Sequence, residues 1–137
     1  MGISDELKAR REALVMEHMT AETNMDAGAA LATMSADAVY EFPVMGRTFR
    51  GPDEIRALLQ ALFTAMPGMV HRAERIYHAD DSVIVESAAD VPGMDVPLRA
   101  VAIFPFTDDV MLGERLFADL TPVLPYLNLT ETAATAP

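Results

Sequence analysis

The residues that could carry chemistry are a histidine and two carboxylic acids, His18, Glu22 and Asp119. His18 and Glu22 are four residues apart in the stretch from Leu7 to Asp26, where apolar residues repeat at helical spacing, and both fall on the apolar side. Polar side chains on a face that packs inward need partners. Asp119 lies near the end of the last apolar stretch. The 137 residues include no cysteine, so any chemistry depends on His, Asp, Glu, Tyr or Arg.

These three residues are suited to proton transfer. A reaction beside a carbonyl group needs a base that takes a proton from carbon and a donor that stabilises the resulting oxyanion. A desolvated Asp119 could be the base, and His18, oriented by Glu22, could be the donor or a proton relay. In the alternative interpretation, His18 and Glu22 only hydrogen-bond to each other in the core. Asp119 would then cap the turn into Thr121-Pro122 or pair with Arg115.

A metal site is a third interpretation of the same residues. One histidine and two carboxylates can bind Mn, Fe or Zn, so His18, Glu22 and Asp119 could form a facial set of ligands. Only His18 and Glu22 have a defined spacing. We therefore predict that the protein acts without a metal and without any other cofactor.

The composition predicts one globular domain that binds neither nucleic acid nor a membrane. The chain is 51% hydrophobic and 23% charged, and no apolar run approaches the ~20 residues that cross a bilayer. A net charge of -11 would repel phosphates. The N-terminal stretch carries charges of both signs, unlike a signal peptide, so we expect a cytoplasmic location.

The elements that must position the candidate residues are helices followed by strands. Helices are predicted over 7–24, 27–34 and 51–66, and strands over 38–44, 48–50, 70–78, 82–89, 96–106 and 110–120. Such segregation is typical of an α+β fold, in which a curved sheet closes over the helices and leaves a conical pocket. Residues 1–127 are assigned to this single domain, and the small, polar residues 128–137 to a flexible tail.

Four stretches carry a resemblance to a known family. They are His18-x3-Glu22-x3-Asp26, SADAVYEFP at 35–43, FRGPDEIR at 49–56 and GERLFAD at 113–119. In this order they resemble the nuclear transport factor 2-like superfamily, and within it the SnoaL-like polyketide cyclases and ketosteroid isomerase-like proteins. The resemblance covers about residues 7–127. It implies a cone-shaped barrel of curved, mixed, mostly antiparallel sheet around N-terminal helices, a homodimer, and a mostly apolar pocket.

The resemblance does not carry the isomerase machinery over to this chain. Ketosteroid isomerases have a carboxylate base just before the proline of the first strand, where this chain has Phe42. Their oxyanion hole pairs a tyrosine of the first helix with a protonated aspartate, and the nearest matches here are His18 and Ala102. The SnoaL-like cyclases are similar to this chain in placing an acid/base aspartate on the last strand. Asp119 fits that position, and Glu114 is the other acid of this strand.

The predicted substrate-binding residues are mostly apolar and aromatic. They are Tyr40, Phe42, Met45, Phe63, Leu98, Phe104, Arg115 and Phe117. Arg115 should share a face with Phe117 and Asp119 unless a bulge interrupts the strand, and it could then orient Asp119 or bind a substrate carboxylate. Glu41 alternates with lining residues and should point outward.

Together these features predict a cofactor-independent enzyme of the SnoaL-like type. Its expected reaction is an isomerisation, cyclisation or dehydration by proton transfer on a small, largely apolar carbonyl compound. The alternative is a non-catalytic ligand-binding or dimerisation module of the same fold. The enzyme requires His18 and Asp119 within reach of one substrate, and the binder does not. His71 and His78 stand beside charged residues and are interpreted as exposed to solvent.

Overall fold

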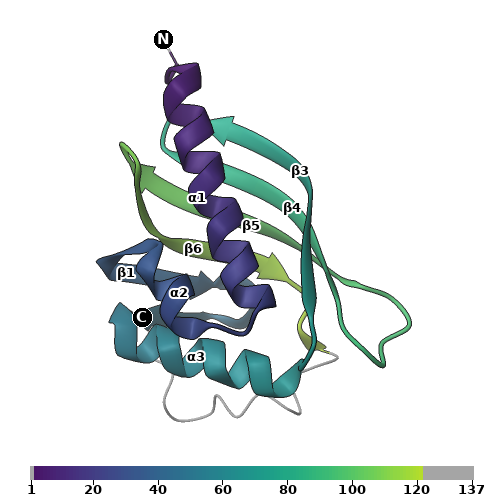
Figure 1. Cartoon of the computed structure of the whole chain (residues 1–137). Coiled ribbons are helices and arrows are strands. Elements are labelled where there is room, and N and C mark those ends of the chain that lie inside the picture. Colours follow the sequence, from purple (N-terminus) through teal and green to yellow (C-terminus); the bar gives the residue numbers. More distant parts are fainter. Residues whose placement is uncertain (1, 122–137) are drawn as a thin grey trace.

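A long N-terminal helix crosses one face of a strongly curved sheet in this computed structural model, which describes residues 2–121 (Figure 1). The elements are α1 (Asp5–Thr23), α2 (Ala27–Ala32), β1 (Met34–Phe42), the 3-10 turn η1 (Pro43–Met45), β2 (Arg47–Arg50), α3 (Gly51–Ala65), β3 (Val70–Ala79), β4 (Ser82–Asp90), β5 (Leu98–Thr107) and β6 (Val110–Ala118). The predicted tail and the end of the predicted domain, residues 122–137, lie outside the described part.

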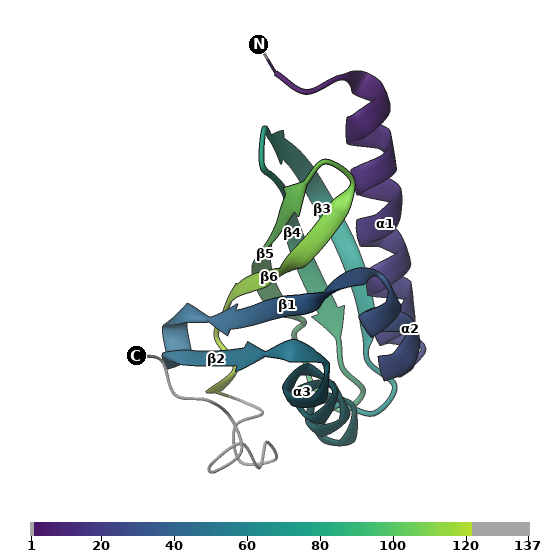
Figure 2. The same cartoon turned by 90° about the vertical axis from the view of Figure 1, so that its left-hand side faces the viewer.

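The six strands form one mixed sheet in the order β2-β1-β6-β5-β4-β3. All neighbouring strands are antiparallel except β1 and β6, which are parallel. The helices lie on the inner side of the curve (Figure 2). The predicted α+β fold, with a curled and mostly antiparallel sheet around N-terminal helices, is therefore confirmed.

The two N-terminal helices begin at side-chain caps. The Ser4 hydroxyl accepts a hydrogen bond of 3.1 Å from the Leu7 N–H, and the Asp26 carboxylate accepts one of 2.9 Å from the Ala29 N–H. The cap at Asp26 starts α2 immediately after α1 ends. As a result, the short second helix packs back against the buried side of the first, where His18 lies.

The first strand begins earlier than the sequence predicts. Its expected start was Ala38, but Met34 already pairs with Met111 of β6, and the second helix ends at Ala32. The segment Ser35–Asp37 consists of two polar residues and an exposed alanine, so its side chains give no strand pattern. Pairing with another strand, which sequence periodicity does not reveal, extends the strand here.

Buried apolar side chains form two clusters on the inner side of the sheet. The cluster between α3 and β1 includes Tyr40, Phe42, Phe49, Ile55, Leu58, Leu59 and Phe63. The cluster between α1 and the middle strands includes Val15, Met19, Val83, Val85, Phe104 and Met111. Within residues 2–121, no helix is both long enough and apolar enough to cross a membrane.

Candidate active site

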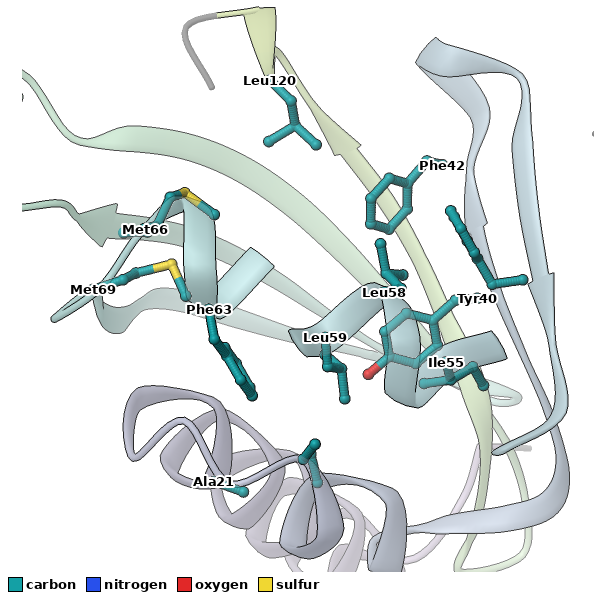
Figure 3. Close-up of a cluster of buried hydrophobic side chains, with 14 of the residues drawn as sticks. Ala21, Tyr40, Phe42, Ile55, Leu58, Leu59, Phe63, Met66, Met69 and Leu120 are labelled. Atoms are coloured by element: carbon teal, nitrogen blue, oxygen red, sulfur yellow. The ribbon is translucent and has the colours of Figure 1, made fainter. Parts of the chain in front are cut away.

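A cavity lies between α1, α3 and the concave face of the sheet. Its empty volume is about 790 Å³, including space open to solvent. Most of its lining is apolar and consists of Met19, Phe42, Leu62, Phe63, Met66, Met69, Val85, Ala89, Leu98, Ala100, Ala102, Phe104, Leu116, Ala118 and Leu120. Its polar lining residues are Glu22, Tyr40, His71, Ser87 and Glu114. Several of the apolar side chains and Tyr40 are drawn in Figure 3.

His18 is fully buried and is held in one orientation. Its Nδ1 lies 2.8 Å from Thr33 Oγ1 and 3.3 Å from the Ala30 carbonyl oxygen. The Thr33 hydroxyl donates its own hydrogen to the Ala30 oxygen at 2.6 Å, so it accepts a hydrogen bond from His18 Nδ1–H. In the neutral imidazole, Nε2 is then an acceptor, and the Tyr40 hydroxyl donates to it at 2.7 Å.

Two buried carboxylates approach the same imidazole nitrogen. His18 Nε2 lies 3.7 Å from Glu22 Oε2 and 3.6 Å from Glu114 Oε1. Glu22 is 8% exposed and Glu114 is 7% exposed. On the cavity side, His71 Nε2 lies 3.8 Å from Glu22 Oε1. The part of the chain that the structure describes places no lysine or arginine in the cavity wall, so acids and histidines are its ionisable groups, with the Tyr40 phenol.

Burial and mutual charge shift the pKa values in this cluster. Burial raises the pKa of Glu22, and the charge of Glu114 adds to this, although His18 and His71 act in the opposite direction. Burial alone would lower the pKa of His18, but the charges of Glu22 and Glu114 raise it overall. Burial and the nearby carboxylates raise the pKa of Tyr40 well above its ordinary value, so the phenol keeps its hydrogen.

A β-bulge in β6 decides which acid faces the cavity. In the ladder with β5, Phe106 is opposite Met111 and Ile103 is opposite Arg115, so β6 has one more residue than β5 between these pairs. Gly113 lies in this segment with a φ of 139°. Because side chains alternate along a strand, one extra residue exchanges the two faces of everything that follows.

After the bulge, Glu114 and the apolar residues that alternate with it line the cavity. Arg115 and Phe117 lie on the opposite, outer face. There, Arg115 Nε is 3.7 Å from Glu41 Oε2, and its guanidinium carbon is 5.5 Å from the centre of the Phe117 ring. The predicted substrate-binding residues Arg115 and Phe117 are thus not in the cavity wall, and Glu41 points outward as expected.

Asp119 lies outside the buried cluster. It is exposed, and its Oδ1 accepts a hydrogen bond of 3.0 Å from the Thr121 N–H. Hydrogen bonding to Thr121 lowers the pKa of Asp119, which is the opposite of what a base near neutrality needs. The turn-capping alternative describes this geometry. The acid that the structure brings to His18 and Glu22 is Glu114.

The family of the chain follows from its sequence. The model of the SnoaL-like domain matches residues 15–111. The chain belongs to this family. None of the curated proteins compared with this SnoaL-like protein matches it.

Solved structures share the fold of this SnoaL-like protein. A proposed SnoaL-like polyketide cyclase from Jannaschia sp. CCS1 superimposes with a TM-score of 0.74 and 16% identity, covering 93% of this chain and 97% of the other. A proposed ketosteroid isomerase from Kribbella flavida has a TM-score of 0.68 and 16% identity, covering 81% and 78%. An epoxide hydrolase of the LEH-like type from M. tuberculosis has a TM-score of 0.66 and 21% identity, covering 87% and 90%. At these identities the similarity establishes the fold.

The other predicted substrate-binding residues are divided between the cavity and the core. Those that line the cavity are Tyr40, Phe42, Phe63, Leu98 and Phe104. Met45 does not line it: it lies in η1, after β1 has ended at Phe42, and packs partly buried against the cluster around α3.

Neither histidine of β3 is fully solvated. His71 lines the cavity, and its side chain is only 21% exposed. The side chain of His78 is 15% exposed, and its Nε2 lies 2.9 Å from Glu12 Oε2. Both belong to the inward-facing side of β3, which packs against α1. Arg72, the charged neighbour of His71, is exposed, and Asp80 and Asp81, which follow His78, lie in the turn after the strand.

The buried cluster also has a spacing that a metal ion could use. One ligand atom each from His18, Glu22 and Glu114 lies within 4.8 Å of the others, so the set left open by the sequence exists with Glu114 in place of Asp119. However, His18 Nε2 already has the Tyr40 hydroxyl as a hydrogen-bond partner at 2.7 Å. The arrangement as it stands is suited to holding and moving protons.

Proposed function

We propose that this SnoaL-like protein is an enzyme that transfers a proton on a small, largely apolar carbonyl compound, with Glu114 as the base and Glu22 as the acid. The observation that supports this best is a pair of buried carboxylates in unlike surroundings at the polar end of an apolar cavity. Two carboxyl groups in one site share protons, and the group whose charge is less favoured keeps one.

Glu22 suits the role of the acid. Burial and the charge of Glu114 raise the pKa of Glu22, so its carboxyl group can remain protonated and donate a hydrogen bond to a carbonyl oxygen. Glu114 suits the role of the base, because its carboxylate lies in the cavity wall with Oε1 3.6 Å from His18 Nε2, beside the Tyr40 hydroxyl. In this proposal His18 and Tyr40 are positioning residues, and Thr33 holds His18 in turn.

The proposed step uses only these groups. Glu114 takes a proton from the carbon beside the carbonyl group, the electrons of that C–H bond form the double bond of an enolate, and Glu22 donates a hydrogen bond to the oxyanion. Return of the proton to another carbon gives isomerisation. Attack of the enolate carbon on a second carbonyl group gives cyclisation, and the proton held by Glu114 then neutralises the new alkoxide. Dehydration results when the electrons of the enolate expel a hydroxyl group from the carbon next to the one that lost its proton, and this group leaves as water with the proton from Glu114.

The solved neighbours support proton transfer only at the level of the fold. Their names include an isomerase, a cyclase and an epoxide hydrolase, and each of these reactions moves protons. A homodimer belongs to the proposal through the family resemblance alone, and a cytoplasmic location stays a prediction from the sequence. Sedimentation velocity of the purified protein tests the dimer.

Deuterium exchange tests the proposal without knowledge of the natural substrate. In D₂O, the protein should accelerate the loss of the NMR signals of C–H groups beside the carbonyl in neutral cyclic ketones such as cyclohexanone. Glu114→Gln should lower this rate by about 100-fold, because an amide cannot take the proton. Glu22→Gln should lower it only about tenfold, because an amide N–H still donates a hydrogen bond to the oxyanion.

Asp119→Asn is the matched control, since it changes an exposed carboxylate outside the cavity. It should exchange deuterium at the wild-type rate. Loss of exchange in Asp119→Asn with normal exchange in Glu114→Gln would show that Asp119 is the base and would refute the assignment of Glu114. Ketone binding without any exchange in the wild type would instead identify the protein as the non-catalytic binder.

A further inference from the structure

We infer that the cavity has a second polar subsite at Ser87, which binds a hydroxyl or carbonyl oxygen of the ligand, so that the substrate is a neutral compound with two oxygen functions. This inference rests on the proposed function in one respect: it assumes that the carbonyl oxygen of the substrate binds at the acid pair, Glu22 and Glu114. Ser87 lies on β4, away from that pair in sequence, and no role in the proton transfer requires it.

Ser87 is a buried hydroxyl that faces the cavity without a partner. It is 8% exposed and belongs to the cavity lining. Within residues 2–121 its hydroxyl group makes no hydrogen bond to another residue. Its oxygen is not one of the enclosed side-chain atoms that lack a partner, so it is reachable from the cavity. A ligand that displaces water there must supply a hydrogen bond to this hydroxyl, because a hydroxyl group left unpaired in an apolar site is unfavourable.

The wall around Ser87 is shaped to admit a ligand. Its partner on β5 is Ala100, and Ala100 in turn is opposite Ala118 of β6. Ala89 is the next residue of β4 that faces the cavity. These methyl groups leave the space above this part of the sheet open. A ligand ring or chain that lies on these alanines would bring a polar substituent into contact with Ser87, the one polar residue among them.

His71 places a second polar group beside Ser87. In the ladder between β3 and β4, His71 is opposite Ala89, and Ser87 is opposite Ala73, so His71 and Ser87 are diagonal neighbours on the concave face. His71 also approaches Glu22, with 3.8 Å between Nε2 and Oε1. The polar groups therefore continue from the acid pair across β3 to Ser87.

The charge of the cavity indicates a neutral oxygen at this subsite. Among the described residues its wall contains two glutamates and no lysine or arginine. The whole chain has a net charge of -11. A carboxylate or phosphate on the ligand would be repelled at close range, whereas a hydroxyl or ketone oxygen can pair with the Ser87 hydroxyl. The substrate class is therefore a hydroxyketone or diketone, and this matches the second oxygen that a cyclisation or dehydration requires.

Ligand pairs that differ by one hydroxyl group test this subsite. Binding of 3-hydroxycyclohexanone and of cyclohexanone is measured by NMR titration of the full chain. We expect the wild type to bind the hydroxyketone about tenfold more tightly, as one hydrogen bond in an apolar site predicts. Ser87→Ala should remove this difference while binding of cyclohexanone stays the same. The acid 3-oxocyclohexanecarboxylate should bind more weakly than either ketone.

Ser82→Ala is the matched control for stability and packing. Ser82 lies on the same strand and is 7% exposed, but it does not line the cavity. This variant should keep the full preference for the hydroxyketone. The inference is overturned if the wild type shows no preference, if the preference survives in Ser87→Ala, or if the carboxylate binds best. Because binding is measured without turnover, a missing deuterium exchange would refute the proposed function and leave this result standing.

Discussion

Gly113 lies so close to Val39 that a Cβ atom added to Gly113 would be 1.9 Å from the Val39 carbonyl oxygen. The two residues pair where β1 and β6 run parallel, next to the bulge of β6. The φ of 139° at Gly113 is also one that residues with a Cβ rarely adopt. This close approach allows the bulge, and the bulge turns Glu114 toward His18.

Gly113→Ala should therefore destabilise the fold strongly. The methyl group would displace backbone rather than a flexible side chain, and we expect the free energy of unfolding to fall by about 3 kcal/mol or more. Urea denaturation followed by circular dichroism measures this. Gly46→Ala is the control, because Gly46 has a φ of 65° but nothing within 4 Å of an added Cβ. It should cost only about 1 kcal/mol. Equal losses in both variants would show that the contact with Val39 is not decisive.

Tyr40→Phe tests whether the phenol positions the base. The variant keeps the buried ring but removes the hydroxyl that is hydrogen-bonded to His18 Nε2 at 2.7 Å. We expect deuterium exchange to slow about tenfold while ketone affinity changes little, because one hydrogen bond corresponds to about that factor. Tyr77→Phe is the control: its hydroxyl donates to Glu86 at 2.7 Å on the exposed face. A purely structural role of Tyr40 would instead alter affinity and rate together.

The fold could be predicted from the sequence because local signals and the tertiary structure agree. α3 begins at Gly51 with Pro52, Asp53 and Glu54 in its first turn, and its apolar side chains from Ile55 to Phe63 repeat at helical spacing. The strands end at turns that the sequence marks with Pro, Gly and Asp. Local signals and the tertiary structure disagree at the start of β1. There, pairing of Met34 with β6 extends the strand, although the side-chain pattern does not indicate it.

The candidate site was only partly predictable. His18 and Glu22 were found because polar residues stand out in a helical apolar stripe. The sequence favours Asp119 over Glu114 only if the strand is regular, and the single extra residue at the bulge of β6, which exchanges its two faces, leaves no mark in the composition. A signal did exist: Glu114 alternates with three apolar residues, Leu116, Ala118 and Leu120, as expected of a cavity-facing strand. No comparable pattern pointed to His71, whose position depends on how β3 packs against α1.

The rate of deuterium exchange should fall as the pH rises if Glu22 acts as the acid. Burial raises the pKa of Glu22, so this decline should come above the ordinary range of a carboxyl group. In Glu22→Gln the amide donates at every pH, and this decline should disappear. Initial exchange rates measured from about pH 4 to 9 provide the comparison. An identical decline in the variant would mean that another group supplies the proton.

The stability of the fold should also decrease as the pH rises, and the sign follows from two buried groups. Folding raises the pKa values of both Glu22 and His18. A group with a raised pKa in the folded state binds protons more tightly there, so its stabilisation is complete below the unfolded pKa. It is lost as the pH rises through the folded pKa. For Glu22 that loss of stability begins above pH 4.5, the ordinary pKa of a glutamate, and for His18 it begins above pH 6.5, the ordinary pKa of a histidine.

Glu22→Gln separates this contribution from the general repulsion of an acidic chain. The amide cannot ionise, and it also removes one of the two charges that raise the pKa of His18. We therefore expect the urea midpoint of Glu22→Gln to depend less steeply on pH than that of the wild type, with the largest difference on the alkaline side. Glu17→Gln, which changes an exposed acid of the same helix, should keep the wild-type slope because it removes the same unit of charge without touching the buried cluster. Parallel slopes in the wild type and both variants would mean that Glu22 does not hold a proton in the folded protein, and the acid in the proposed pair would have to be sought elsewhere.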